Sequence, residues 1–298
     1  PDDFSLDFAT KAIFRGPLMR CLVKQYRYKK FRLPFNRTQV MGILNITPDS
    51  FSDGGKFYNK TSLAVKHAGV MIKQGADIID VGGESSRPGA EPVGAGEEAR
   101  RVIPVIRGIV KRYPKTLVSI DSYKPEVVKK ALDEGAAMIN DISGLRHPEM
   151  ARHAADSKAP VVIMHMKGNP QTMQKRPAYK DVVGDIVRFF EERIKFCRDN
   201  AISKIILDPG IGFGKTGKHN LSILRRLDEI TGLGYPTLIG VSRKSFIGKS
   251  LGGLTDDRES ATIAVNVIAI NKGVSIIRVH DVEKNIQAVR MADFINNS

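Results

Sequence analysis

From about residue 38 onward, eight short runs of apolar and β-branched residues alternate with longer amphipathic stretches. Each run is too continuously apolar for a strand with one face in water, so the runs predict buried strands of a parallel sheet. The segments between them have helical spacing, as Ile186, Phe190 and Ile194 illustrate. Eight strand–helix units in succession favour an α/β fold closed into a (β/α)8 TIM barrel over an open sheet. The expected strands are residues 40–45, 78–82, 117–121, 138–141, 161–166, 205–208, 237–241 and 275–280.

The chain has 298 residues, a length that fits one such barrel. We expect residues 38–298 to form the barrel domain and residues 1–37 to form a short basic N-terminal extension. Two helices are expected after the seventh strand, a short one near Phe246 and a longer one over residues 261–271.

The cysteines and the hydropathy of the sequence indicate where in the cell the protein is located. The chain has two cysteines, Cys21 and Cys197, which are far apart in sequence and form no CxxC pair. They therefore favour a reducing, cytoplasmic location. We expect no membrane association, because no apolar run reaches the roughly 18 residues that a spanning helix needs.

The formal net charge of +15 raises the possibility of nucleic-acid binding. The charge is concentrated, however, since residues 11–37 carry nine Lys or Arg and no acidic residue, and the rest of the chain has no basic stripe interleaved with aromatics. Such a cluster is usually a solvated face or a flexible arm, and it is also suited to an acidic partner. We expect no nucleic-acid partner, and the sequence leaves the role of this segment open.

Polar residues gather at the carboxyl ends of almost all the expected strands, which is the face where barrels collect their active sites. A single polar strand end is ordinary, but a whole set at one face predicts a site. The residues are Asn45, Glu84, Asp121, Ser122, Asn140, Asp141, His165, Asp208, Ser242, Lys244, Arg278 and His280.

Three of these side chains, Asp121, Asn140 and Asp208, are expected to share the barrel mouth. Two carboxylates close together in a buried place need a cation or a ligand with donors. Lys244 is one such cation, and a heterocycle with a ring N–H beside an exocyclic amine would pair bidentately with a carboxylate. The alternative is an ion-pair network that only supports the barrel.

Arg278, His280 and Asn45 are expected to meet where the last strand lies beside the first. An arginine, a histidine and an amide suit an anion, and barrels often hold a phosphate near the last two strands. The oxygen of Asn45 would serve as a ligand for Mg²⁺ beside the phosphates.

Two long loops, residues 47–55 and 82–89, follow the first and second strands and mix Gly and Pro with hydroxyl and charged residues. We interpret them as lids with Phe51 and Arg87 at their tips, although plain connectors have the same composition. The glycines around Phe213 would allow its ring and the backbone to lie close to a flat ligand. Ser245 lies at the start of an expected helix, where anions bind.

Eight segments in order resemble the signatures of the dihydropteroate synthases, a family of pterin-binding barrels. The resemblance covers about residues 38–298. The segments are MGILNITPDSFSDGG (41–55), IIDVGGESSRPG (78–89), SIDS (119–122), IND (139–141), MHMKGNPQTMQ (164–174), DPGIGFGK (208–215), SRKSF (242–246) and RVHD (278–281).

The resemblance implies a role for each site residue. The residues implied to hold the pterin ring are Asp121, Asn140, Met164, Asp208 and Lys244. Those implied to hold pyrophosphate with Mg²⁺ are Asn45, Arg278 and His280. Those implied to form the p-aminobenzoate pocket and its lids are Phe51, Ser86, Arg87, Phe213 and Ser245, together with Lys244. Within these sets, Asp121, Lys244, Arg278 and His280 are the residues expected to take part in catalysis.

The resemblance also implies a reaction. Pyrophosphate leaves 6-hydroxymethyl-7,8-dihydropterin pyrophosphate first, and the amine of p-aminobenzoate then attacks the exposed methylene to give 7,8-dihydropteroate. It implies a homodimer that associates through its outer helices. It also implies that the protein belongs to a family that sulfonamides target. One departure is Ser86, where threonine is more usual. A pterin-binding methyltransferase domain is the alternative, but it would not need the SRKSF segment, the two long loops or the Arg278–His280 pair.

Overall fold

The structure is a computed structural model that describes residues 21–47, 61–85, 89–253 and 258–298. Eight parallel strands lie in the order β8-β7-β6-β5-β4-β3-β10-β9. Their near-complete burial explains the continuous apolar runs of the sequence. The strands are β3 (Gln39–Asn45), β4 (Ile78–Gly82), β5 (Leu117–Asp121), β6 (Met138–Asp141), β7 (Val161–Met164), β8 (Ile205–Asp208), β9 (Leu238–Ile239) and β10 (Ile276–Val279).

The sheet closes between β8 and β9. The Leu207 N–H donates to the Pro236 carbonyl at 2.8 Å, and Leu207 forms a parallel bridge with Thr237. The predicted (β/α)8 barrel is therefore confirmed. Strand β9 is shorter than predicted because the chain turns out of the ladder towards Lys244, whose N–H donates to the Val241 carbonyl.

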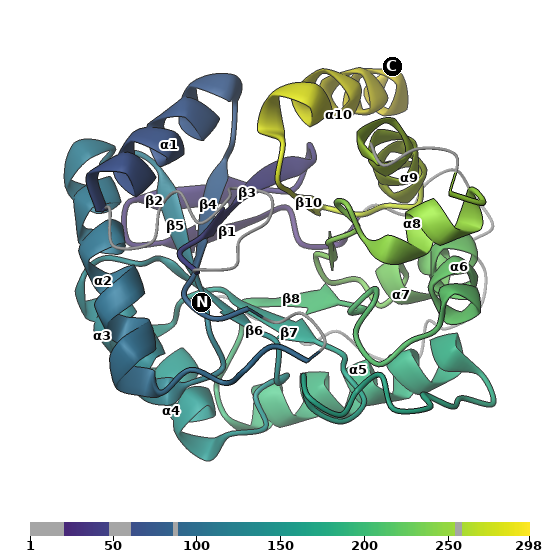
Figure 1. The fold of residues 1–298 in the computed structure, drawn as a ribbon, viewed down its shortest axis with the longest axis horizontal. Coiled ribbons are helices and arrows are strands. Elements are labelled where there is room, and N and C mark those ends of the chain that lie inside the picture. The colour runs from purple at the N-terminus through teal and green to yellow at the C-terminus, as the bar shows by residue number, and fades with distance from the viewer. Residues whose placement is uncertain (1–20, 48–60, 86–88, 254–257) are drawn as a thin grey trace.

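Helices follow the strands and cover the outside of the barrel (Figure 1). Both helices predicted after the seventh barrel strand are present, as α8 and α9. Within the part of the chain that the structure describes, none of the helices has the length and hydropathy to cross a membrane. The helices are α1 (Thr61–Gln74), α2 (Ala95–Arg112), α3 (Pro125–Asp133), α4 (Pro148–Ser157), α5 (Val182–Asp199), α6 (Gly217–Arg225), α7 (Leu227–Thr231), α8 (Ser245–Ser250), α9 (Glu259–Asn271) and α10 (Val282–Asn297).

Several helix starts are fixed by local sequence. Helix α6 begins with a capping box in which Thr216 and His219 satisfy each other's backbone N–H groups. The Asp281 side chain caps α10 by accepting from the Lys284 N–H at 3.1 Å. These caps end the loops that follow β8 and β10, so they help to fix the loop residues that face the barrel mouth.

Part of the basic N-terminal extension is folded, which the sequence did not predict. Strands β1 (Gln25–Tyr28) and β2 (Phe31–Pro34) form an antiparallel hairpin. Its apolar side chains are buried in the core, and the Tyr26 hydroxyl donates to the Ile205 carbonyl at 2.7 Å at the start of β8. Its basic residues Arg27 and Arg32 are exposed, so this stretch of positive charge is a solvated face.

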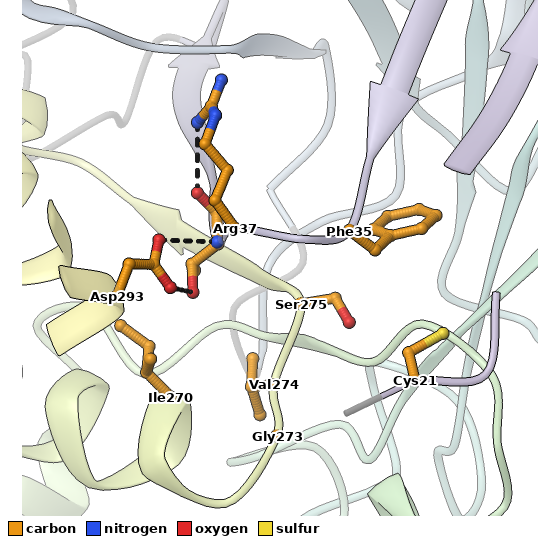
Figure 2. Close-up of a pocket in the computed structure, with 9 residues that line it drawn as sticks. Cys21, Phe35, Arg37, Ile270, Gly273, Val274, Ser275 and Asp293 are labelled. Carbon is orange, nitrogen blue, oxygen red and sulfur yellow. Dashed lines mark hydrogen bonds between the residues drawn. The ribbon is translucent and has the colours of Figure 1, made fainter. Parts of the chain in front are cut away.

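Beside the hairpin, a small cavity lies at the amino-terminal ends of β3 and β10 (Figure 2). Asp293 of α10 accepts from the Thr38 N–H at 2.7 Å and from the Thr38 hydroxyl at 2.9 Å. The cavity holds about 10 Å³, which is room for no more than one water molecule. This end of the barrel is therefore structural, and the substrate site must be sought at the other end.

Candidate active site

The carboxyl ends of the strands bring the predicted residues together in one cavity of about 1570 Å³. Strand register sets part of this arrangement, since Asn45, Gly82, Asp121 and Asn140 lie side by side across β3, β4, β5 and β6. The predicted residues that line the cavity are Asn45, Glu84, Asp121, Asn140, Met164, Asp208, Phe213, Ser242, Lys244, Ser245, Arg278 and His280, whereas Ser122, Asp141 and His165 do not line it. Phe51, Ser86 and Arg87 lie outside the described residues, so their placement stays a prediction.

An arginine–carboxylate cluster forms the floor of the cavity. Arg278 donates from Nε to Asp80 Oδ2 and from Nη2 to Asp121 Oδ2, both at 2.6 Å. Asn140 Nδ2 also donates to Asp80 Oδ2, at 3.0 Å. We had expected Arg278 to meet His280 and Asn45 at the β10–β3 junction. Those strands are adjacent, but the guanidinium is directed to the two carboxylates and only part of its donor set remains for an anion.

Burial perturbs the charge states of this cluster. It raises the pKa of Asp121 to about 7, and the neighbouring carboxylates add to this while the Arg278 guanidinium opposes it. Burial lowers the pKa of Arg278, but Asp80 and Asp121 more than reverse that effect. The arginine therefore stays charged, and Asp121 is the group that titrates near neutral pH.

Lys244 reaches the cavity from the N-cap position of α8. Its Nζ donates to the Ile211 carbonyl and lies 4.2 Å from the centroid of the Phe213 ring. Burial lowers the pKa of Lys244 to about 8, against the opposing effect of Asp208. Gly212 permits this packing, because a Cβ there would lie 3.0 Å from Lys244 Cδ and its φ is +81°. The ammonium, the ring and the Gly-rich turn thus form one wall.

Asp208 ends β8 opposite Met164, its register partner on β7. Its Oδ1 accepts from the Gly210 N–H at 2.7 Å, which leaves Oδ2 as the carboxylate oxygen that is available to a ligand. Burial raises the pKa of Asp208, although the Gly210 N–H and the Lys244 and Lys215 ammoniums oppose the rise. The thioether of Met164 and the ring of Phe213 belong to one small apolar cluster, which provides a surface for a flat ring.

His280 lies just beyond β10. Its Nδ1 is 3.0 Å from the Ser242 hydroxyl, which also accepts from the His280 N–H at 3.2 Å. This contact holds the imidazole beside the loop that carries Lys244. Asn45, His280 and Arg278 all line the cavity, and an amide, an imidazole and a guanidinium are groups that suit an anion.

The described residues include no group of three His, Cys, Asp or Glu that could hold a metal ion. Mg²⁺ needs fewer protein ligands when substrate phosphates and water supply the rest. The side-chain oxygen of Asn45 is suited to be one ligand of such an ion. A metal ion held by the protein alone would need more protein ligands than this.

Comparison with known proteins identifies the family. A model of the pterin-binding enzyme family matches residues 41–280. The chain belongs to this family. The dihydropteroate synthase of Escherichia coli (strain K12) is 48% identical over 263 residues, which is 88% of this chain and 93% of that one.

Solved structures of other pterin-binding enzymes agree. The Yersinia pestis dihydropteroate synthase in a sulfonamide drug complex superposes with a TM-score of 0.87 at 41% identity, covering 92% of this chain and 100% of that one. The Xanthomonas albilineans dihydropteroate synthase in complex with 7,8-dihydropteroate has a TM-score of 0.79 at 38% identity, covering 90% and 97%. These matches favour a synthase over the methyltransferase alternative.

One unpredicted feature of this pterin-binding enzyme is a buried lysine behind the Gly-rich turn. Lys215 Nζ donates to the His165 carbonyl at 3.1 Å and to the Phe213 carbonyl at 2.9 Å, and it lies 3.0 Å from His165 Nδ1. Burial lowers the pKa of Lys215 to about 7 and that of His165 to about 2. A neutral imidazole thus accepts from the lysine, and the contact joins the loop after β7 to the loop after β8.

A second unpredicted feature is the set of contacts around Glu84, which directly follows the β4 end of the cavity. The Tyr123 hydroxyl donates to Glu84 Oε1 at 2.6 Å, and the Val93 N–H donates to Oε2 at 3.1 Å. Lys124 Nζ pairs with both Glu84 and the buried Glu98. Glu84 therefore lines the cavity, as predicted, and also anchors the loop after β4.

Proposed function

We propose that the chain is a dihydropteroate synthase. It joins 6-hydroxymethyl-7,8-dihydropterin pyrophosphate to p-aminobenzoate and releases pyrophosphate. The observation that carries this proposal is that Asp121, Asn140, Asp208 and Lys244 converge in one cavity of a pterin-binding enzyme. Formation of 7,8-dihydropteroate by the purified chain from these two substrates tests it.

The pterin ring would lie between Met164 and the Lys244 wall. Asp208 would accept from the ring N–H and the exocyclic amine, because its Oδ2 is available and Oδ1 keeps a second lone pair beside the Gly210 N–H. Asp121 and Asn140 would accept from donors on the other side of the ring. Lys244 would donate to a ring acceptor and balance the carboxylates.

The p-aminobenzoate would lie towards the outer part of the cavity. Phe213 offers a ring face, and Ser245 offers a hydroxyl at the start of α8. Phe51, Ser86 and Arg87, on the two loops that follow β3 and β4, are the residues that we propose to complete this pocket. The Arg87 guanidinium would pair with the benzoate carboxylate.

The pyrophosphate would contact Arg278, His280 and Asn45, whose chemistry suits an anion. Arg278 uses Nε and Nη2 on carboxylates, so Nη1 is the edge that we assign to phosphate oxygens. We propose that Mg²⁺ arrives with the pyrophosphate and takes Asn45 as one ligand. When bound, the ion would neutralise charge on the departing oxygens.

In the reaction, the bond between the pterin methylene and the pyrophosphate oxygen breaks, and both electrons leave with pyrophosphate. Arg278 and His280 stabilise that negative charge. The carboxylate of Asp121 stabilises the cationic pterin, and if the loops after β3 and β4 are lids, as we propose, they would exclude water. The p-aminobenzoate nitrogen then bonds to the methylene and loses a proton. No covalent nucleophile is required.

The affinity for the pterin should fall on both the acid and the alkaline side of an optimum pH. Asp121 must be ionised to accept from the ring, and its pKa of about 7 means that affinity rises as pH increases through 7. Lys244 must be protonated to donate, and its pKa of about 8 means that affinity falls as pH increases through 8. Calorimetric titration of 6-hydroxymethyl-7,8-dihydropterin, whose N8–H is a donor on that side of the ring, should therefore give a maximum between the two values.

Lys244→Arg tests whether Lys244 causes the loss of affinity at high pH, which we call the alkaline limb; the loss at low pH is the acid limb. Arginine stays charged throughout, so the alkaline limb should disappear while the acid limb remains. The ligand's own titration is common to both proteins and is measured separately. An alkaline limb unchanged in the variant would contradict the assignment to Lys244.

We also propose a homodimer that associates through α9 and α10, which pack against each other. Large apolar side chains are exposed on these two helices: Ile268 at 52%, Met291 at 60%, Phe294 at 73% and Ile295 at 66%. Met291, Phe294 and Ile295 lie on one face of α10 by their spacing, and exposed apolar side chains gathered in this way usually mark an interface. The cytoplasm is the location that we propose, since Cys21 and Cys197 are both free thiols.

Phe294→Lys should convert the dimer to a monomer, because it places a charge at the most exposed apolar position of this face. Light scattering coupled to size-exclusion chromatography measures the mass. Leu63→Lys is the matched control, since Leu63 is an exposed apolar residue on α1 rather than on α9 or α10. A mass that Phe294→Lys leaves unchanged would contradict the proposed interface.

A further inference from the structure

We propose that Asp80 is a positioning residue that sets the orientation of the Asn140 amide and the Arg278 guanidinium towards the pterin. The inference rests on the proposed function and deepens it, because it states which groups of the site accept hydrogen bonds from the ligand and which donate them. Asp80 lies in the middle of β4 and is fully buried, and it does not line the cavity. Any effect it has on a ligand must therefore pass through its neighbours.

All the hydrogen bonds found for the Asp80 side chain go to site residues. Its Oδ2 accepts from Asn140 Nδ2 at 3.0 Å and from Arg278 Nε at 2.6 Å. Within the described part of the chain, its Oδ1 has no hydrogen-bond partner. A buried carboxylate is costly, and this one is not used to join parts of the barrel outside the site. Its two bonds serve the residues that face the ligand.

The contact decides which end of the Asn140 amide faces the cavity. An ionised carboxylate only accepts, so it must meet the NH2 group of Asn140. The Asn140 oxygen then points the other way and offers an acceptor to the ring. With Asp121 and Asp208, the site thus presents three acceptors to the N–H donors of the ring. Without Asp80, the two amide orientations would differ much less in energy.

The same carboxylate orients the arginine. Because Nε is bound to Asp80, the guanidinium plane is fixed, and Nη2 reaches Asp121 at 2.6 Å. The remaining Nη1 edge is then available to the pyrophosphate. One buried oxygen thus aligns a pterin contact and a phosphate contact at the same time.

Substitutions at position 80 test this polarity. In Asp80→Leu, Asn140 and Arg278 both lose the oxygen that they share, so neither amide orientation is selected and the guanidinium is no longer held. Affinity for 6-hydroxymethyl-7,8-dihydropterin, measured by calorimetry, should fall at least about tenfold. Asn140→Asp should also lose affinity, because it places a second carboxylate against Asp80.

Asp80→Asn is the conservative variant. Because one oxygen of Asp80 accepts from both donors, the single amide oxygen in that place still accepts from Asn140 and Arg278, and the NH2 group takes the place of Oδ1. We expect its affinity to stay within about threefold of the unsubstituted protein. Ser119→Ala is the matched control, because Ser119 is the buried register partner of Asp80 on β5 and lies outside the cavity. It should bind the pterin normally.

The outcomes separate the inference from the proposed function. If the unsubstituted protein does not bind the pterin, the proposed function fails and the inference fails with it. If that protein binds and Asp80→Leu binds equally well, only the inference is overturned. An Asp80→Asn variant that binds no better than Asp80→Leu also overturns it, because the shared oxygen would then have no effect on the ligand. Should Asp80→Leu not fold, Asp80→Ala takes its place.

Discussion

Replacing Asp208 with asparagine should reduce the affinity for 6-hydroxymethylpterin roughly 10- to 100-fold. The asparagine has one oxygen. In the unsubstituted protein the Gly210 N–H donates to Oδ1 at 2.7 Å, and it would donate to that single oxygen in the variant. The NH2 group would then face the ring N–H and the exocyclic amine, so donors would oppose donors. Calorimetry with the purified variant measures the change directly.

Asp141→Asn is the control for this result. Asp141 is also a buried carboxylate at a strand end, but its side chain accepts from the Ser143 and Leu145 N–H groups and lies outside the cavity. Its substitution should lower stability and leave pterin affinity unchanged. If Asp208→Asn bound the pterin as well as the unsubstituted protein does, Asp208 would have no place in the site.

Replacing Arg278 with alanine should have the largest combined effect on stability and binding. The two carboxylates that Arg278 pairs with, Asp80 at 0% and Asp121 at 16% side-chain exposure, would lose their cation. Breaking a buried pair in this way lowers the free energy of unfolding by about 3–5 kcal/mol. Urea unfolding at neutral pH measures this loss.

Ligand binding to Arg278→Ala should change selectively. The affinity for ligands that carry a pyrophosphate should fall far more than the affinity for p-aminobenzoate, because only the pyrophosphate contacts the guanidinium. Arg278→Lys, which keeps the charge but loses the planar fork, should lie between the two proteins. Equal weakening of both ligands would remove Arg278 from the pyrophosphate subsite.

The sequence was sufficient for the barrel because its strands are buried on both faces. Continuous apolar runs such as residues 205–208 mark such strands, and the closed sheet then places every carboxyl end on one face. Asp121, Asn140 and Asp208 could be assigned to one cavity for that reason alone. Their individual roles in binding remain predictions, because no ligand contact tests them.

The contacts within the site could not be predicted in the same way. Asp80 and Arg278 are 198 positions apart in sequence, and their pairing depends on side-chain directions inside the barrel. A signal did exist, since Asp80 is the one charged residue in the run 78–82 and a buried charge needs a partner. Lys215 was missed because it follows a Gly-rich turn, where a lysine is normally exposed.

The hairpin of β1 and β2 was missed for a different reason. Each strand has four residues, and the alternation of buried residues such as Tyr26 and Tyr28 with exposed basic residues is too short to stand out within a basic cluster. Its stability comes from packing against the base of the barrel, which local sequence does not reveal.

Pyrophosphate release tests the proposed synthase activity most directly. The purified chain is incubated with 6-hydroxymethyl-7,8-dihydropterin pyrophosphate and Mg²⁺, with and without p-aminobenzoate, and pyrophosphate and pteroate products are quantified. We predict release that depends on p-aminobenzoate and yields one 7,8-dihydropteroate for each pyrophosphate. A folded protein that binds the pterin but forms no dihydropteroate would contradict the proposed function.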